Sequence, residues 1–467
     1  MRLSEKMEEN KVISVMRSAL MSKTCMIIQC LVAVISIILR RSENELAIVY
    51  GDLVLAAIFC LIIVICDDLM TTTLPFLLIS TISIKCYDSF DLFIQYVYIA
   101  PVIVASIIFH FIVYRQPIDF GKTWKGALAV AIAVTLGGLG KISVAEYFSG
   151  TALYYTVGLG FGMFGIYLLM NSHFGWSKKY NMRYRFSFIM TLAGLVCVFM
   201  IAHHYYMYWE NFTSSLSPVY FQWRNNVSTI LLLTMPFTFF LSSSHYVYFF
   251  AGLLQYIAIL FTGSRGGAIS GTITVALCLI VLVYCDVRNR KKTLIIIAST
   301  VFVMLTFFVR PLMRFFAPLL ERIADGDEIR EGLISRAIED FNSNIVFGRG
   351  LGYNGNADIH EAPKFAICWY HSSPFQVIGS FGLVGVAAFL FQFYNRMKVI
   401  WERITQFSLT LFVAYAGLFL MSLVNPGEFC PIPYGLMATL LFIICDKNNI
   451  AAEEVKAEKD EEYRLTL

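Results

Sequence analysis

Long apolar runs alternate with short polar segments along nearly the whole chain. A helix needs about 20 mostly apolar residues to cross a bilayer, and we find runs that approach or reach this length at residues 24–39, 47–66, 69–84, 93–113, 127–148, 151–170, 186–204, 227–241, 246–262, 268–285, 293–309, 375–394, 406–424 and 434–445. Their length and the absence of an alternating period favour helices over strands. The pattern predicts an all-α, polytopic integral membrane protein with about 12–14 transmembrane helices.

Composition supports this class and excludes others. Of the 467 residues, 58% are hydrophobic and 15% are charged, whereas soluble domains carry about 25% charged residues. A single water-soluble core has no room for so much apolar side chain. The net charge is only +4, and no long block of like charges marks a nucleic-acid-binding arm. The lipid bilayer is therefore the expected solvent, and nucleic acid is not an expected partner.

The distribution of positive charge predicts the orientation. Most of the 36 lysine and arginine residues lie in segments that share one side if both termini are cytoplasmic. The predicted organisation is a cytoplasmic N-terminal segment at 1–23, transmembrane helices 1–11 at 24–309, one large extracytoplasmic loop at 310–374, transmembrane helices 12–14 at 375–445, and a charged, mobile cytoplasmic tail at 446–467.

The large loop contains a helical pattern. Apolar residues recur every three to four positions, at Leu333, Ile334, Ala337, Ile338 and Phe341. This spacing predicts an amphipathic helix that lies on the membrane surface. Arg336 and Asp340 fall at the edge of its apolar face.

Separated arginines mark the candidate anion-binding residues. Arg265 lies in Ser264-Arg265-Gly266-Gly267, between two apolar runs, where a charge is costly. A guanidinium beside backbone N–H groups at a helix start is suited to an anion; the alternative is an arginine that snorkels to the interface. Arg224 precedes the eighth run.

Two further arginines belong to the large loop: Arg336, and Arg349 within the glycine-rich stretch 348–352. Separated arginines that close around one diphosphate are more informative than a run of them. Each by itself has the alternative of an ordinary interfacial residue.

His371 is the candidate for proton transfer. It stands in Tyr370-His371-Ser372, where the large loop returns to the membrane. Histidine transfers protons near neutral pH; the alternative is a residue that anchors the loop. Lys141, in the outer half of the fifth run, is either functional, as intramembrane charges commonly are, or a snorkelling residue.

Three motifs in order resemble the O-antigen polymerase and O-antigen ligase superfamily. They are Leu260-Phe261-Thr262-Gly263-Ser264-Arg265-Gly266-Gly267; Ser335-Arg336-Ala337-Ile338-Glu339-Asp340-Phe341 followed by Val346-Phe347-Gly348-Arg349-Gly350-Leu351-Gly352; and Tyr370-His371-Ser372-Ser373-Pro374-Phe375-Gln376 followed by Phe381-Gly382-Leu383-Val384-Gly385. The similarity covers roughly residues 220–395.

The resemblance implies a function and site residues. Members of the family transfer glycan from a polyprenyl-diphosphate donor to a glycan acceptor without a metal, a nucleotide sugar or another cofactor. Carried over, Arg265 and Arg336 bind the donor diphosphate, Arg224 is a further basic position, and His371 is the general base. Ser372 replaces the usual asparagine, and the tryptophan often found after the loop arginine is missing. The supporting residues are Ser264, Gly266, Arg349, Lys141 and Glu428.

The sequence hypothesis is therefore a glycosyltransferase. It polymerises lipid-linked repeat units, with inversion, on the outer face of a bacterial plasma membrane during capsule, O-antigen or exopolysaccharide synthesis. A flippase and a chain-length regulator of the same pathway are the implied protein partners. One alternative is a ligase that transfers the glycan to a different acceptor. Others are a flippase or transporter, for which related halves and broken helices are expected but not evident in the sequence, and a non-catalytic scaffold.

Overall fold

A computed structural model shows a helical protein. It describes residues 9–40, 46–84, 99–139, 158–175, 181–215, 223–286, 290–308, 328–351, 370–425, 427–429 and 431–465, together with the isolated residues 7, 218, 219, 221, 310, 313, 317 and 321. All regular structure in these residues is helical. The all-α prediction is confirmed, and each of the predicted apolar runs contains a helix.

Several helices have the length and composition of membrane spans. Within the described residues, four qualify alone: α4 (Leu46–Ile65), α11 (Met182–Met207), α15 (Arg265–Cys285) and α19 (Ser373–Glu402). A fifth span arises if α2 (Lys11–Leu20) and α3 (Lys23–Leu39), which meet at a 56° bend, are taken together. Shorter apolar helices accompany them. These helices suggest a multi-pass membrane protein, and the number of 12–14 spans remains a prediction.

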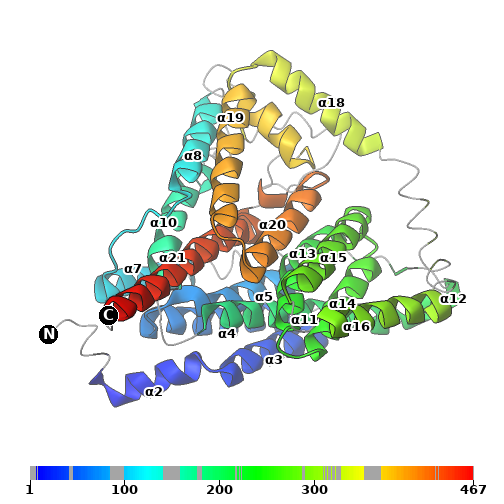
Figure 1. Cartoon of the computed structure of the whole chain (residues 1–467). Coiled ribbons are helices and arrows are strands. Elements are labelled where there is room, and N and C mark those ends of the chain that lie inside the picture. The colour runs from blue at the N-terminus through cyan, green and yellow to red at the C-terminus, as the bar shows by residue number, and fades with distance from the viewer. Residues whose placement is uncertain are drawn as a thin grey trace. The chain divides into compact units, whose positions relative to one another are not determined.

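The helices belong to two compact units (Figure 1). Unit 1 comprises residues 1–117 and 173–324, and unit 2 comprises residues 118–172 and 325–467. Besides α2, α3, α4, α11 and α15, unit 1 contains η1 (Leu69–Thr72), α5 (Thr73–Ser83), α7 (Ile99–Tyr114), α12 (Trp209–Ser215), α13 (Arg224–Leu241), α14 (Val247–Phe261) and α16 (Arg290–Val303). Besides α19, unit 2 contains α8 (Trp124–Leu139), α10 (Met163–His173, ending at the boundary), α18 (Glu328–Ser343), α20 (Gln406–Ser422), η7 (Gly427–Phe429), η8 (Pro431–Gly435) and α21 (Leu436–Leu465).

Helix α13 forms the core of unit 1. It is buried along nearly its whole length and packs on α11, α14 and α15. Thr238 of α13 donates to Thr191 of α11 at 3.1 Å and accepts from the Gln255 amide of α14 at 2.9 Å. Such interhelical hydrogen bonds between buried polar side chains stabilise helix packing in lipid. They lie near the C-terminal end of α13, three turns or more from Arg224 at its start.

In unit 2, the hydrophobic core lies between helices α8 and α19. Val134 of α8 packs with Val377 and Phe381 of α19, and with Leu351 and Phe429 from two loops. Helix α18 packs against α19 in turn (Figure 1). The unit therefore joins the predicted large loop to the helix that follows it.

The C-terminal segment differs from the prediction. A mobile tail was expected from Asp446, but α21 continues without interruption from Leu436 to Leu465. Its first charged residues have partners in unit 2: Asp446 accepts from the Lys122 backbone at 3.0 Å, and Lys447 donates to Asp119 at 2.5 Å. These contacts stabilise the helix beyond the apolar run.

Candidate active site

Two predicted arginines begin neighbouring helices in unit 1. Arg224 is the first residue of α13 and Arg265 is the first residue of α15. The Ser264 hydroxyl donates to the Asn225 side chain at 2.7 Å and accepts from the Gly267 amide at 3.0 Å. Ser264 thus caps α15 and joins the beginnings of both helices.

This junction has the electrostatics of an anion site. The N-terminal end of a helix carries partial positive charge and bare N–H groups, and here two such ends meet. Arg224, Arg265 and Gly266 are all half-buried. Two guanidinium groups therefore add full charges to the two helix ends, which suits a dianionic group more than a neutral one.

Helix α18 confirms the predicted loop helix but buries a different face. Leu333 and Ala337 are buried as expected, whereas Ile338 is exposed and Asp340 is buried. Ile338 of the predicted apolar face lies on the protein surface, and its contact with the membrane stays a prediction. The buried stripe is rotated toward Asp340 because that carboxylate has partners within unit 2.

Asp340 is the centre of a polar network. It accepts a hydrogen bond from the Tyr370 hydroxyl at 2.5 Å, and its other oxygen lies 3.7 Å from Nε of Arg349. The same Nε donates to the Ser343 hydroxyl at 2.5 Å. Burial raises the pKa of the Asp340 carboxyl, while the Tyr370 hydrogen bond and the charge of Arg336 oppose this rise. Arg349 and Arg336 thus both lie beside a buried carboxylate.

The network brings Arg336 and His371 to the same part of unit 2. Arg336 lies one turn before Asp340 on α18, half-buried and 3.3 Å from the exposed carboxylate of Glu339. His371 directly follows Tyr370, and its backbone has a φ of 52°. This left-handed conformation is uncommon for histidine and is found where the surrounding structure holds it.

Helix α19, which follows His371, is broken at Gly382, where φ is 59° and ψ is −151°. Carbonyls before a break and N–H groups after it lose their helical partners. Here the loop after α18 supplies them. The amides of Arg349 and Gly350 donate to Gly379 and Ser380, both at 2.8 Å.

The remaining two hydrogen bonds of this junction run in the opposite direction. The amides of Leu383 and Val384 donate to the carbonyls of Ile345 and Val346, at 2.9 and 3.1 Å. We call these four bonds the backbone clamp. It supplies partners for the backbone groups at the break and fixes Arg349 against the part of α19 that follows His371, which explains why the glycine-rich motif and the motif at 381–385 occur together.

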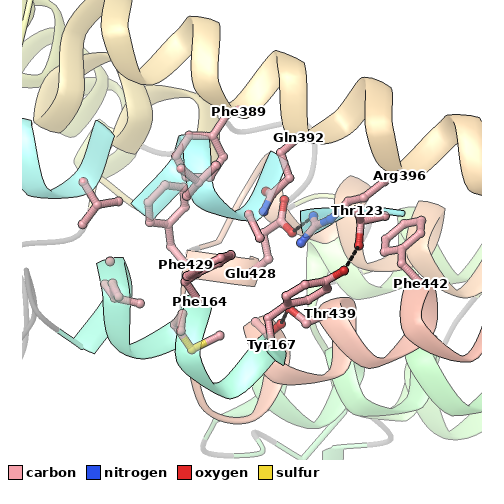
Figure 2. Close-up of a pocket in the computed structure, with 17 residues that line it drawn as sticks. Thr123, Phe164, Tyr167, Phe389, Gln392, Arg396, Glu428, Phe429, Thr439 and Phe442 are labelled. Atoms are coloured by element: carbon pink, nitrogen blue, oxygen red, sulfur yellow. Dashed lines mark hydrogen bonds and ion pairs between the residues drawn. The ribbon is translucent and has the colours of Figure 1, made fainter. Parts of the chain in front are cut away.

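A separate, mainly apolar cavity of about 80 Å³ with a few polar groups on its wall lies in unit 2 (Figure 2). Arg396 and Glu428 form an ion pair of 2.6 Å on its wall, and both are largely buried. The Arg396 guanidinium also donates to the Tyr415 hydroxyl at 3.2 Å, and its charge lies 5.1 Å from the centre of the Phe442 ring. Gln392, Tyr167 and Thr439 add polar groups to the same cavity.

This pair revises the predicted place of Glu428. Glu428 was predicted as a supporting residue of the site that contains the arginines and His371, and its partner Arg396 was not predicted as a site residue. In the structure the two are bonded, and Arg396 lies roughly 20 Å along α19 from the break at Gly382. Glu428 therefore belongs to the cavity and lies apart from the Asp340 network.

Removing one member of this ion pair is expected to destabilise the protein. Glu428→Gln leaves Arg396 buried without a counter-charge, which costs about 3–5 kcal/mol of unfolding free energy. Denaturant unfolding in detergent measures the change. Glu402→Gln is the matched control: its pair with Lys122 is 2.7 Å long but exposed, so about 1 kcal/mol or less is expected. Equal losses in the two variants would contradict the assignment.

The predicted residues thus divide into separate groups. Arg224, Ser264, Arg265 and Gly266 gather in unit 1, while Arg336, Arg349 and His371 gather in unit 2. Lys141 lies outside the described residues. Sequence reasoning missed Tyr370 as a side chain of the site and Arg396 as a buried ion; Arg396 follows the apolar run at 375–394, where a cation is ordinary and gives no signal.

Comparison with known proteins adds no relative: no protein-family model, no curated protein and no solved structure matches the chain.

Proposed function

We propose that the protein is a membrane glycosyltransferase that polymerises polyprenyl-diphosphate-linked glycan on the outer face of a bacterial plasma membrane. The observation that carries the proposal is the Asp340 network, which brings an arginine and a conformationally constrained histidine together in unit 2. The arginine pair at the start of α13 and α15 supports it, because a diphosphate is the kind of anion that two helix ends and two guanidinium groups favour.

The proposed chemistry uses these groups in different roles. The acceptor hydroxyl attacks the anomeric carbon of the donor glycan while His371 takes its proton. The bond between the anomeric carbon and the diphosphate oxygen breaks, and the arginines neutralise the charge that grows on the departing diphosphate. Attack opposite the leaving group inverts the anomeric centre. The product is a longer glycan on one lipid and a free polyprenyl diphosphate.

Reconstitution in vesicles with a polyprenyl-diphosphate oligosaccharide tests the proposal. A ladder of lengthened, lipid-linked glycans is the expected product. A single transfer to a different acceptor would make the protein a ligase. Movement of the lipid across the bilayer without any new glycosidic bond would reject the enzyme.

A flippase or transporter is the second candidate, because the structure contains features that the sequence did not reveal. Helix α19 is broken at Gly382, and unit 2 holds a cavity with a buried ion pair on its wall. Broken helices and intramembrane charges are typical of transport sites. The break, however, is occupied by the backbone clamp, so its polar groups are already engaged; this favours the enzyme.

Arg265→Lys tests whether the arginine binds diphosphate through its planar fork. Lysine keeps the charge but cannot donate two parallel hydrogen bonds. We expect kcat/KM for the donor to fall at least about tenfold, the equivalent of one lost charge-assisted hydrogen bond. Radiolabelled donor measures the rate. If Arg265 only snorkels, lysine will replace it with near-normal polymer yield.

Cysteine labelling tests the orientation on which the outer-face site depends. Glu331 in the large loop and Lys292 in the first turn of α16 are both exposed in the structure. On a background without reactive native thiols, Glu331→Cys should react with an impermeant maleimide added to intact cells. Lys292→Cys should react only after the membrane is opened, because it lies in a segment with clustered positive charge. The reverse pattern would reject the orientation.

A further inference from the structure

Tyr370 is held from three sides. Its N–H donates to the Gln376 side chain at 3.1 Å, and its hydroxyl donates to Asp340 at 2.5 Å. Its ring packs on Gly379, where a Cβ atom would lie only 3.0–3.2 Å from the ring atoms. Gln376 is itself fixed, since its amide donates to Ser380 at 3.0 Å. The side chain and backbone of Tyr370 are therefore immobilised by α18 and α19 together.

His371 depends on this anchor because it is the next residue and has a strained backbone. A positive φ at a residue other than glycine persists only where neighbouring contacts hold it. The Tyr370–Asp340 bond joins the segment just before α19 to α18, so it sets the position of the histidine relative to Arg336, one turn from Asp340. A ring atom misplaced by about 1 Å lowers the rate of a proton transfer strongly.

We propose that Asp340 and Tyr370 are positioning residues that hold His371 for proton transfer, an inference that rests on the proposed glycosyltransferase function. Asp340 acts as the acceptor for the Tyr370 hydroxyl, and Tyr370 transmits the constraint to His371 through the peptide bond. Neither residue touches the reacting atoms in this assignment. The hydrogen bond, rather than the carboxylate charge, is the feature that matters for His371.

Three variants separate the hydrogen bond from charge and packing. Tyr370→Phe keeps the ring against Gly379 and removes only the hydroxyl. Asp340→Ala removes the acceptor, while Asp340→Asn keeps an acceptor oxygen and removes the charge. Tyr394→Phe is the matched control, because Tyr394 is an exposed tyrosine of α19. Steady-state rates with a polyprenyl-diphosphate oligosaccharide give kcat and the donor KM, and thermal unfolding in detergent reports folding.

The expected result is a change in kcat alone. Tyr370→Phe and Asp340→Ala should each lower kcat roughly ten- to a hundredfold, with the donor KM within about twofold of wild type. Their combination should be no worse than either, because both remove the same bond. Asp340→Asn should restore most of the rate, and Tyr394→Phe should be silent.

Other outcomes identify which statement is wrong. Four results with an active wild type would reject the positioning role and leave the proposed glycosyltransferase function intact. Tyr370→Phe could keep full activity, or the losses of rate caused by Tyr370→Phe and Asp340→Ala could multiply in the double variant. Asp340→Asn could lower the rate as much as Asp340→Ala, or the variants could raise only the donor KM. If the folded wild type makes no new glycosidic bond, the proposed function is rejected and the inference with it. Tyr370→Phe keeps the test decisive if the alanine variant fails to fold.

Discussion

Replacing His371 with glutamine is expected to abolish glycan transfer while leaving donor binding intact. Glutamine offers hydrogen-bonding groups but cannot accept the acceptor's proton, and losing a general base typically costs about 10²–10⁴ in rate. The arginines that hold the diphosphate are unchanged, so the lipid donor should still bind. Single-turnover rates measure the loss, and retention of labelled donor by detergent-solubilised protein measures binding.

The control for this prediction is another described histidine. His245 is exposed in unit 1 and belongs to neither group of site residues, so His245→Gln should leave the rate within about twofold, as is usual for surface substitutions. If His371 only anchors the loop, glutamine should support full turnover, and His371→Ala should reduce the amount of folded protein instead. A fully active His371→Gln enzyme at normal abundance would remove the base from the mechanism.

The pattern of apolar residues was sufficient to predict where the helices lie, but it did not predict where a helix is broken. Apolar runs place helices at their observed positions because burial in lipid or in protein requires the same continuous apolar length. The break at Gly382 was not evident, since one glycine is tolerated inside an apolar run. It exists because residues 345–350 satisfy the backbone groups on both sides of it, and hydrogen bonds between distant segments leave no local periodic signal.

In the candidate site, too, some features could be predicted from the sequence and others could not. Arg265 and Arg336 were recognisable because charges beside apolar runs are costly and therefore informative. The burial of Asp340 was misjudged as an edge position, because the face of an amphipathic helix was read from apolar residues alone, whereas Tyr370 and Arg349 draw the carboxylate inward. The ion pair between Arg396 and Glu428 was not predicted, because the two residues are 32 positions apart in sequence. The spacing of apolar residues along the chain carries no information about such long-range pairs.

Gly382→Ala is expected to disrupt the backbone clamp and, with it, the active site. An alanine Cβ would lie 2.5 Å from the carbonyl oxygen of Ile345 and 2.7 Å from the backbone of Val346. The combination of a φ of 59° with a ψ of −151° is also accessible essentially only to glycine, at a cost of about 1–3 kcal/mol for other residues. The loop must therefore move away, and the amides of Leu383 and Val384 lose their acceptors.

Amide hydrogen exchange measures the opening of the backbone clamp directly and does not depend on any enzymatic activity. In wild-type protein the amides of Arg349, Gly350, Leu383 and Val384 should exchange slowly, because all four donate within the clamp. In Gly382→Ala they should exchange together and much faster, since the clamp opens as a unit. Glycan transfer should fall with them, because the loop that carries Arg349 is released from the segment that follows His371.

Gly165→Ala is the matched control for this substitution. Gly165 lies within α10 of the same unit, and nothing is found within 4 Å of the position that a Cβ would occupy. Alanine there should leave exchange at the clamp unchanged and should raise stability by up to about 1 kcal/mol through its better helix propensity. Unchanged exchange in Gly382→Ala would mean that the break in α19 does not depend on the clamp, and the link between the glycine-rich motif and His371 would have to be abandoned.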